Sequence, residues 1–122
     1  MTAGEDFLRR CRRDRISYEF ENDEKLQKLF FSCLPSCPET LCWDLYEEME
    51  ILVFGRETKA GFEETLASVI DLVTGEYNSE QSVLDDDEIT AVYEAVNDYA
   101  LDLPEDLVFT VMQVAVERGL MG

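Results

Sequence analysis

The sequence predicts an all-α fold, a compact bundle of five to six short helices that includes an antiparallel helical hairpin. Apolar residues recur with the period of a helix along most of the chain, and residues typical of helix ends separate these stretches. The chain has 122 residues, of which 46% are hydrophobic, enough for one core. We therefore expect residues 1–122 to form a single acidic helical domain with an arginine-rich segment at 1–15.

The first predicted helix covers about residues 4–13, and its apolar face consists of Phe7, Leu8 and Cys11. A short extended segment is predicted next, because apolar residues alternate at Ile16, Tyr18 and Phe20. The second helix is predicted at about 23–33, where the spacing i, i+3, i+4, i+7 is occupied by Leu26, Leu29, Phe30 and Cys33. Pro35 and Pro38 end this helix.

The third helix is predicted to begin with a capping box formed by Ser36 and Glu39, with Pro38 in its first turn. Gly55 is expected to end it in the left-handed conformation. Thr58 is the predicted N-cap of the fourth helix, and Gly75 ends that helix. The connection between the two is short, so they are expected to form the antiparallel hairpin.

Residues 75–84 form the longest predicted loop. Asp85 is expected to cap the fifth helix, with Glu88 three residues later. Pro104 starts the sixth helix, and Arg118 followed by Gly119 forms its end signal.

The net charge is the most unusual property of the chain. There are 28 acidic and 10 basic residues, a formal charge of −18, and no histidine. Binding of nucleic acid or an anionic membrane requires clustered Lys and Arg, so neither is expected. The lack of histidine excludes Ser-His-Asp and Cys-His catalysis and any His-ligated metal.

The charge is also unevenly distributed. Residues 1–15 contain five arginines and three acidic residues. From Ala60 onward there are 15 acidic residues and one basic residue, Arg118. Self-repulsion of this size destabilises a small protein, which favours a functional acidic surface over a purely solubilising one. Glu47, Glu48 and Glu50 of the third helix are candidates for it. The main predicted partner-binding residues are Glu63, Glu64, Asp71, Glu76, Tyr77, Glu80, Asp85, Asp86, Asp87, Glu94, Asp98 and Asp102.

An acidic surface of this kind attracts a basic protein, and many strongly basic surfaces are nucleic-acid-binding sites. In general character the chain is similar to immunity proteins of nuclease toxins and to DNA-mimicking inhibitors of restriction enzymes and CRISPR effectors. The segment Ile51–Glu64 resembles the former. We expect a non-catalytic, stoichiometric inhibitor or immunity-type protein. The alternative is a helical adaptor that binds through an apolar groove, and a homodimer through the third helix also remains open.

Other chemistries fit the sequence less well. Counted from Asp85, an EF-hand would need Gly at position 6 and Glu at position 12, where the chain has Thr90 and Val96. We expect the four cysteines, Cys11, Cys33, Cys37 and Cys42, to be packed free thiols, with zinc binding or oxidation as alternatives. No nucleotide-binding or hydrolase motif is present. We therefore expect no enzymatic activity, no metal and no cofactor.

The location expected from the sequence is cytoplasmic. Residues 1–15 lack the apolar segment of a signal peptide, and the longest apolar stretch, about Leu107–Val116, is half the length of a membrane span. We expect the arginines of residues 1–15 to dock on the acidic helices of the chain itself or to remain on the surface.

Overall fold

The computed structural model describes residues 1–18, 23–55 and 61–120, and within these ranges the chain is an all-α bundle without strands. The elements are α1 (Ala3–Arg13), α2 (Glu24–Ser32), α3 (Glu39–Phe54), α4 (Phe62–Thr74), α5 (Asp86–Asp98), the short 3-10 helix η1 (Ala100–Asp102) and α6 (Glu105–Glu117). The predicted fold class is confirmed. Phe20 and Thr58, used in two of the predictions, lie outside the described residues.

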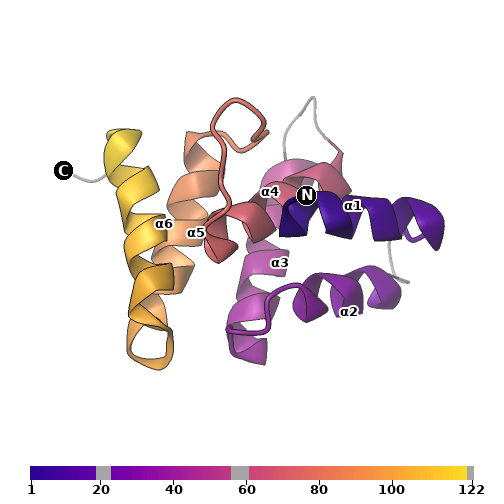
Figure 1. Cartoon of the computed structure of the whole chain (residues 1–122), viewed down its shortest axis with the longest axis horizontal. Coiled ribbons are helices and arrows are strands. Elements are labelled where there is room, and N and C mark those ends of the chain that lie inside the picture. Colours follow the sequence, from indigo (N-terminus) through magenta and orange to yellow (C-terminus); the bar gives the residue numbers. More distant parts are fainter. Residues whose placement is uncertain (19–22, 56–60, 121–122) are drawn as a thin grey trace.

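The helices run in two main directions (Figure 1). α3, α5 and α6 stand side by side, with α5 in contact with both of the others, and α1, α2 and α4 lie across them. α5 and α6 form an antiparallel hairpin through η1. α4 contacts α3 but crosses it, and its most extensive contact is with α1. The antiparallel hairpin is therefore not the predicted pair of third and fourth helices.

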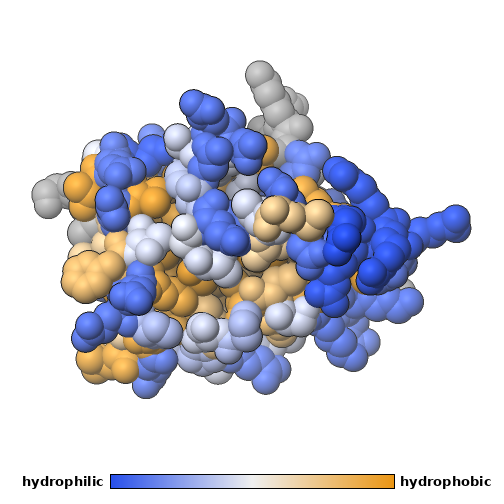
Figure 2. Space-filling model, in the orientation of Figure 1, coloured by the Kyte–Doolittle hydropathy of each residue, from blue (hydrophilic) through white to orange (hydrophobic). Residues whose placement is uncertain are grey.

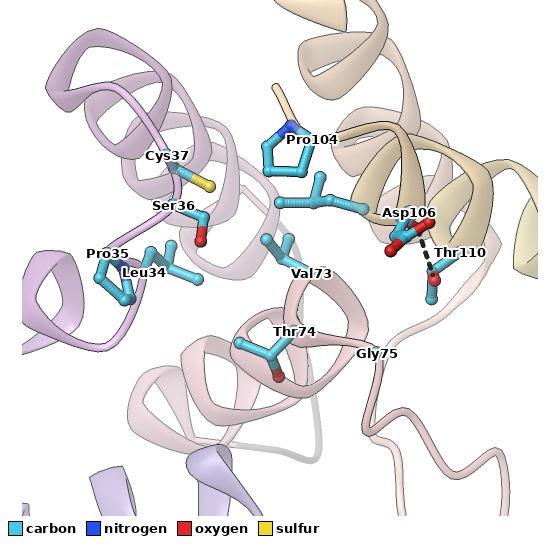
Figure 3. A pocket seen from close by; sticks show the side chains of 11 residues that line it. Leu34, Pro35, Ser36, Cys37, Val73, Thr74, Gly75, Pro104, Asp106 and Thr110 are labelled. Atoms are coloured by element: carbon cyan, nitrogen blue, oxygen red, sulfur yellow. Dashed lines mark hydrogen bonds between the residues drawn. The ribbon is translucent and has the colours of Figure 1, made fainter. Parts of the chain in front are cut away.

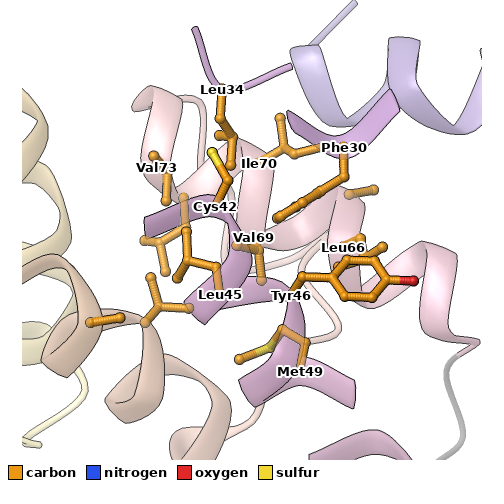
Figure 4. Close-up of a cluster of buried hydrophobic side chains, with 14 of the residues drawn as sticks. Phe30, Leu34, Cys42, Leu45, Tyr46, Met49, Leu66, Val69, Ile70 and Val73 are labelled. Carbon is orange, nitrogen blue, oxygen red and sulfur yellow. The ribbon is translucent and has the colours of Figure 1, made fainter. Parts of the chain in front are cut away.

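The hydrophobic core lies where the two sets of helices cross (Figure 4). Tyr46 of α3, Phe30 of α2 and Leu66 of α4 are each at most 1% exposed. Phe30 packs obliquely against Tyr46, with ring centroids 6.1 Å apart, and edge-on against Phe7 of α1. Burial of one large apolar side chain stabilises the fold by about 1.5–3 kcal/mol. These contacts join α1, α2, α3 and α4 into one unit.

Two predictions about the ends of α3 are wrong. The N-cap is Pro38 in an extended conformation, without a side-chain hydrogen bond, so Ser36 and Glu39 form no capping box. Ser36 lies two residues before the cap and cannot occupy its position. Gly55 is right-handed, with φ −81°, because its N–H still bonds to the carbonyl of Ile51 in the helical pattern.

The remaining helix signals are confirmed, except that Gly61 occupies the N-cap of α4. Gly75 (φ 85°) ends α4 in the left-handed conformation, and the N–H of Glu76 bonds to the carbonyl of Asp71 at 2.8 Å. Gly119 (φ 72°) follows α6 in the same conformation. At the start of α5, Asp85 and Glu88 form a reciprocal capping box.

Arg15, which follows the end of α1, has a backbone conformation that is unusual for a residue other than glycine. Arg15 has φ 54°, and the N–H of Ile16 bonds to the carbonyl of Cys11 at 2.8 Å. This is the left-handed helix end that glycine usually provides, adopted here by a residue with a Cβ. The end of α1 is therefore locally strained.

α1 is attached to α4 through its own N-terminus. The N–H of Gly4 and the hydroxyl of Thr2 donate to the Asp71 carboxylate at 2.8 and 3.1 Å, and the N–H of Ala3 donates to Glu76 at 2.7 Å. Two carboxylates at the end of α4 thus satisfy amide groups that have no partner within α1.

No helix in the described ranges has the length and apolar character to cross a membrane.

Candidate binding surfaces

A concave acidic surface lies between α3 and α5, and we call it the acidic groove. Its volume is about 180 Å³, and it is lined by Asp44, Glu47, Glu48, Ala91, Glu94, Ala95 and Asp98. The two alanines belong to α5, as do Glu94 and Asp98. Five exposed carboxylates from two helices therefore surround one depression.

The carboxylates of the acidic groove have few partners. Asp44 accepts a hydrogen bond from the Tyr99 hydroxyl at 2.9 Å, which ties the start of α3 to the end of α5. None of the five forms a salt bridge with a described residue. Like charges this close repel one another, so the groove attracts cations.

Sequence reasoning found part of the acidic groove. Glu94 and Asp98 are predicted binding residues, and Glu47 and Glu48 are among the wider candidates. Asp44 was missed, although it lies three and four residues before Glu47 and Glu48, a spacing that places all three on one helix face. Nothing in the sequence indicates that this face of α3 meets α5.

Three of the predicted binding residues, Glu63, Asp71 and Glu76, accept hydrogen bonds from backbone N–H groups of residues 3–18. Asp71 and Glu76 hold the N-terminus of α1, as described above. Glu63 accepts a hydrogen bond from the N–H of Tyr18 at 2.7 Å. Burial raises the pKa of Asp71, with a further increase from Glu76, although the hydrogen bonds from Gly4 and Thr2 lower it. These carboxylates lie at contacts within the fold.

A second group of predicted residues gathers at the start of α5. Asp85 is the N-cap, and Asp86 and Asp87 lie in the first turn. Asp86 pairs with Arg118 at 3.3 Å, and Arg118 also donates to the Tyr77 hydroxyl at 2.6 Å. Tyr77 is half-buried against the core, and its hydrogen bond to Arg118 connects the loop before α5 to the end of α6.

The last predicted residues, Glu64, Glu80 and Asp102, lie on separate elements. Glu64 is in the first turn of α4, Glu80 is in the loop before α5, and Asp102 is in η1; all three are exposed. The structure thus divides the predicted set among the acidic groove, the start of α5, the α1–α4 contact and isolated positions.

An apolar pocket of about 270 Å³ lies where the α2–α3 connection, the end of α4 and the start of α6 meet (Figure 3). We call it the junction pocket. It is lined by Leu34, Pro35, Ser36, Cys37, Val73, Thr74, Gly75, Pro104, Asp106, Leu107 and Thr110. The Thr110 hydroxyl donates to the backbone carbonyl of Asp106 at 2.8 Å, and the Thr74 hydroxyl donates to the backbone carbonyl of Ile70 at 2.7 Å. The apolar walls suit an apolar group.

The four cysteines are free thiols, and their surroundings favour the protonated form over the thiolate. Burial raises the pKa of Cys37 to about 12 and the pKa of Cys11 and Cys42 to about 11, and it also raises that of Cys33. A thiol is a nucleophile and a metal ligand only as the thiolate. In the described part of the chain, no group of three or more cysteine and acidic side chains is arranged to hold a metal ion.

The arginines of residues 1–15 make only local ion pairs within the described ranges. Arg9 pairs with Asp6 at 2.6 Å, and Arg13 pairs with Asp14 at 3.1 Å. α1 is hydrogen-bonded to α4 through Thr2 and the Gly4 amide, and Arg9, Arg12, Arg13 and Arg15 are exposed. A strongly hydrophilic region covers this end of the molecule (Figure 2).

We compared the chain with protein-family models, curated proteins and solved structures, and no match was found in any of the three comparisons.

Proposed function

We propose that the protein is a non-catalytic binding protein that inhibits a basic partner by covering its nucleic-acid-binding or active site. The acidic groove carries this proposal, because it combines five carboxylates, a concave shape and no cation partner among the described residues. A lysine or arginine side chain of the partner would enter the groove and bond to carboxylates of both helices.

The total charge supports the same function. A protein of charge −18 draws a basic partner toward it over distances of about 10 Å at 0.1 M salt. Such steering raises association rates and makes them strongly dependent on ionic strength. Strongly basic protein surfaces are commonly nucleic-acid-binding sites, so the partner class is a nuclease toxin, a restriction enzyme, a CRISPR effector or a related protein.

Affinity purification from the native host, followed by mass spectrometry, tests this proposal. The expected result is a basic, nucleic-acid-handling partner in a complex of equal stoichiometry, with binding that weakens steeply as salt rises. The double variant Glu94→Gln/Asp98→Asn should weaken binding at least tenfold, whereas Glu64→Gln/Glu80→Gln, which removes the same charge elsewhere, should weaken it less. Recovery of neutral or acidic partners only, or binding indifferent to salt, would contradict the proposal.

The junction pocket supports a second candidate function, an adaptor that holds an apolar side chain of its partner. Its walls are mainly apolar, and Ser36 lies exposed at its edge. Binding that persists at 1 M salt and is lost in Ser36→Trp, which fills the mouth of the pocket, would favour the adaptor over the inhibitor.

A further inference from the structure

The outer face of α6 is apolar although it is exposed. Phe109 and Val116 are 66% and 57% exposed, and Leu101 of the adjoining η1 is fully exposed. Val108 and Met112, on the same face of α6, are partly exposed. Figure 2 shows this apolar surface along the edge of the molecule occupied by α6. Several large apolar side chains exposed on one helix face are typical of an interaction site.

Part of this surface, over η1 and the first half of α6, is hollowed. A depression of about 260 Å³ lies between η1 and α6 and is lined by Ala100, Glu105, Val108, Phe109 and Met112. Val108, Met112 and Val116 follow one another every four residues, so their side chains form a straight row along α6. The 13 residues of α6 span about 20 Å, the length of three to four turns of a partner helix.

Carboxylates lie at both ends of this apolar row. Asp102 and Glu105 are at its start, where Glu105 lines the depression, and Glu117 is at its end; all three are exposed. The nearby cation, Arg118, is already paired with Asp86. An apolar row with carboxylates at both ends is complementary to an apolar stripe that has Lys and Arg near its ends.

A second copy of the chain fits this face poorly. Parallel pairing of two α6 helices would bring Glu105 against Glu105, and antiparallel pairing would bring Glu105 against Glu117. Each copy also carries a charge of −18. Like charges at both ends of the row thus oppose self-association, whereas a basic partner neutralises them.

We propose that the groove formed by η1 and α6 binds a basic amphipathic helix of another protein, with its apolar side in the row and its Lys and Arg on the carboxylates. This inference rests on the proposed function in one respect, the basic character of the partner. It assigns the docking to a surface separate from the acidic groove, and it adds apolar anchors that charge alone does not provide.

Synthetic helices test this inference without knowledge of the natural partner. The first probe is an 18-residue Leu/Lys peptide with leucines at i, i+3, i+4 and i+7, and the second has the same composition with the leucines shuffled. Binding is measured by calorimetry at 0.15 and 0.5 M salt. We expect the patterned peptide to bind at least tenfold more tightly than the shuffled one at both salt concentrations.

Matched variants locate the site. Phe109→Ser/Val116→Ser should abolish the preference for the patterned peptide, whereas Ile51→Ser/Val83→Ser, which removes exposed apolar side chains of other surfaces, should retain it. Circular dichroism checks that both variants are folded. Equal binding of the two peptides, or a preference unaffected by Phe109→Ser/Val116→Ser, would overturn the inference.

Two further outcomes are distinguishable. A doubled mass of the wild type by light scattering, reduced to the monomer in Phe109→Ser/Val116→Ser, would overturn the inference by identifying a second copy as the occupant. Failure to recover a basic partner from the host would contradict the proposed function, while the peptide result would stand independently.

Discussion

The Asp71 carboxylate of α4 accepts a hydrogen bond from the Gly4 N–H of α1 at 2.8 Å, joining residues 67 positions apart in the sequence. The backbones approach closely here, since a Cβ on Gly4 would lie 2.3 Å from the carbonyl oxygen of Ala67. α1 carries four arginines, yet within the described residues it is anchored to α4 by backbone amides and the Thr2 hydroxyl rather than by those arginines.

Gly4→Ala should destabilise the protein by about 1–3 kcal/mol, because α1 must move away from α4 to accommodate the added methyl group. Chemical denaturation measures the change. Gly61→Ala is the control, since a Cβ there would lie 3.6 Å from its nearest neighbour, an ordinary contact; Gly61 is the N-cap of α4, where alanine is less favourable, so a smaller loss of about 0.5–1 kcal/mol is expected. Equal stability of Gly4→Ala and wild type would contradict the close approach.

Stability near Asp71 should depend on pH in a defined direction. Burial raises the pKa of Asp71 above 3.8, so the folded chain binds this proton more tightly than the unfolded chain. The free energy of unfolding of wild type relative to Asp71→Asn should therefore rise as pH falls from 7 through the folded-state pKa, and become constant below 3.8. Urea unfolding of both proteins at several pH values tests this, and a relative loss of stability on acidification would refute it.

Relief of strain at the end of α1 should stabilise the protein. Arg15 has φ 54°, so Arg15→Gly should gain about 1 kcal/mol over Arg15→Ala, the reverse of their order inside a helix. Both variants remove the same positive charge, so the comparison isolates the conformation. Thermal unfolding provides the measurement, and a less stable glycine variant would show that the left-handed conformation is not retained.

The thiols should react slowly in the folded protein. At pH 8, a pKa of about 12 instead of 9.0 lowers the thiolate fraction of Cys37 by about a thousandfold. Alkylation with iodoacetamide, followed by mass spectrometry, should label Cys37 far more slowly in the native protein than in urea, where all four cysteines should react. Rapid native labelling of Cys37 would contradict the described burial.

Salt should stabilise the wild-type protein, because it screens repulsion across the acidic groove. Glu47→Gln/Glu94→Gln should raise the free energy of unfolding at low salt by about 0.5–1 kcal/mol and reduce its increase with salt. Glu64→Gln/Glu80→Gln serves as the control with the same charge change on separate elements. An equal effect of both double variants would indicate that net charge, rather than the groove, determines the stability.

Much of the fold was predictable from local sequence signals. The capping box of Asp85 and Glu88 and the left-handed Gly75 were confirmed, because they depend on hydrogen bonds between residues at most a few positions apart. The errors at Ser36 and Gly55 have the same local character. Ser36 and Pro38 both suit the start of a helix, and a glycine at the end of a helix can be right- or left-handed. The sequence alone does not show which residue or conformation is used.

Which carboxylates share a surface was decided only by the tertiary structure. Asp44 and Glu94 meet because α3 lies beside α5, and Asp71 holds α1 because α4 lies antiparallel to it. Helical periodicity identifies the polar face of each helix but not the neighbour that this face meets. The sequence by itself therefore determined an acidic, all-α chain with its charge concentrated after residue 60. Packing between distant helices decided which acidic residues stabilise the fold and which line the groove.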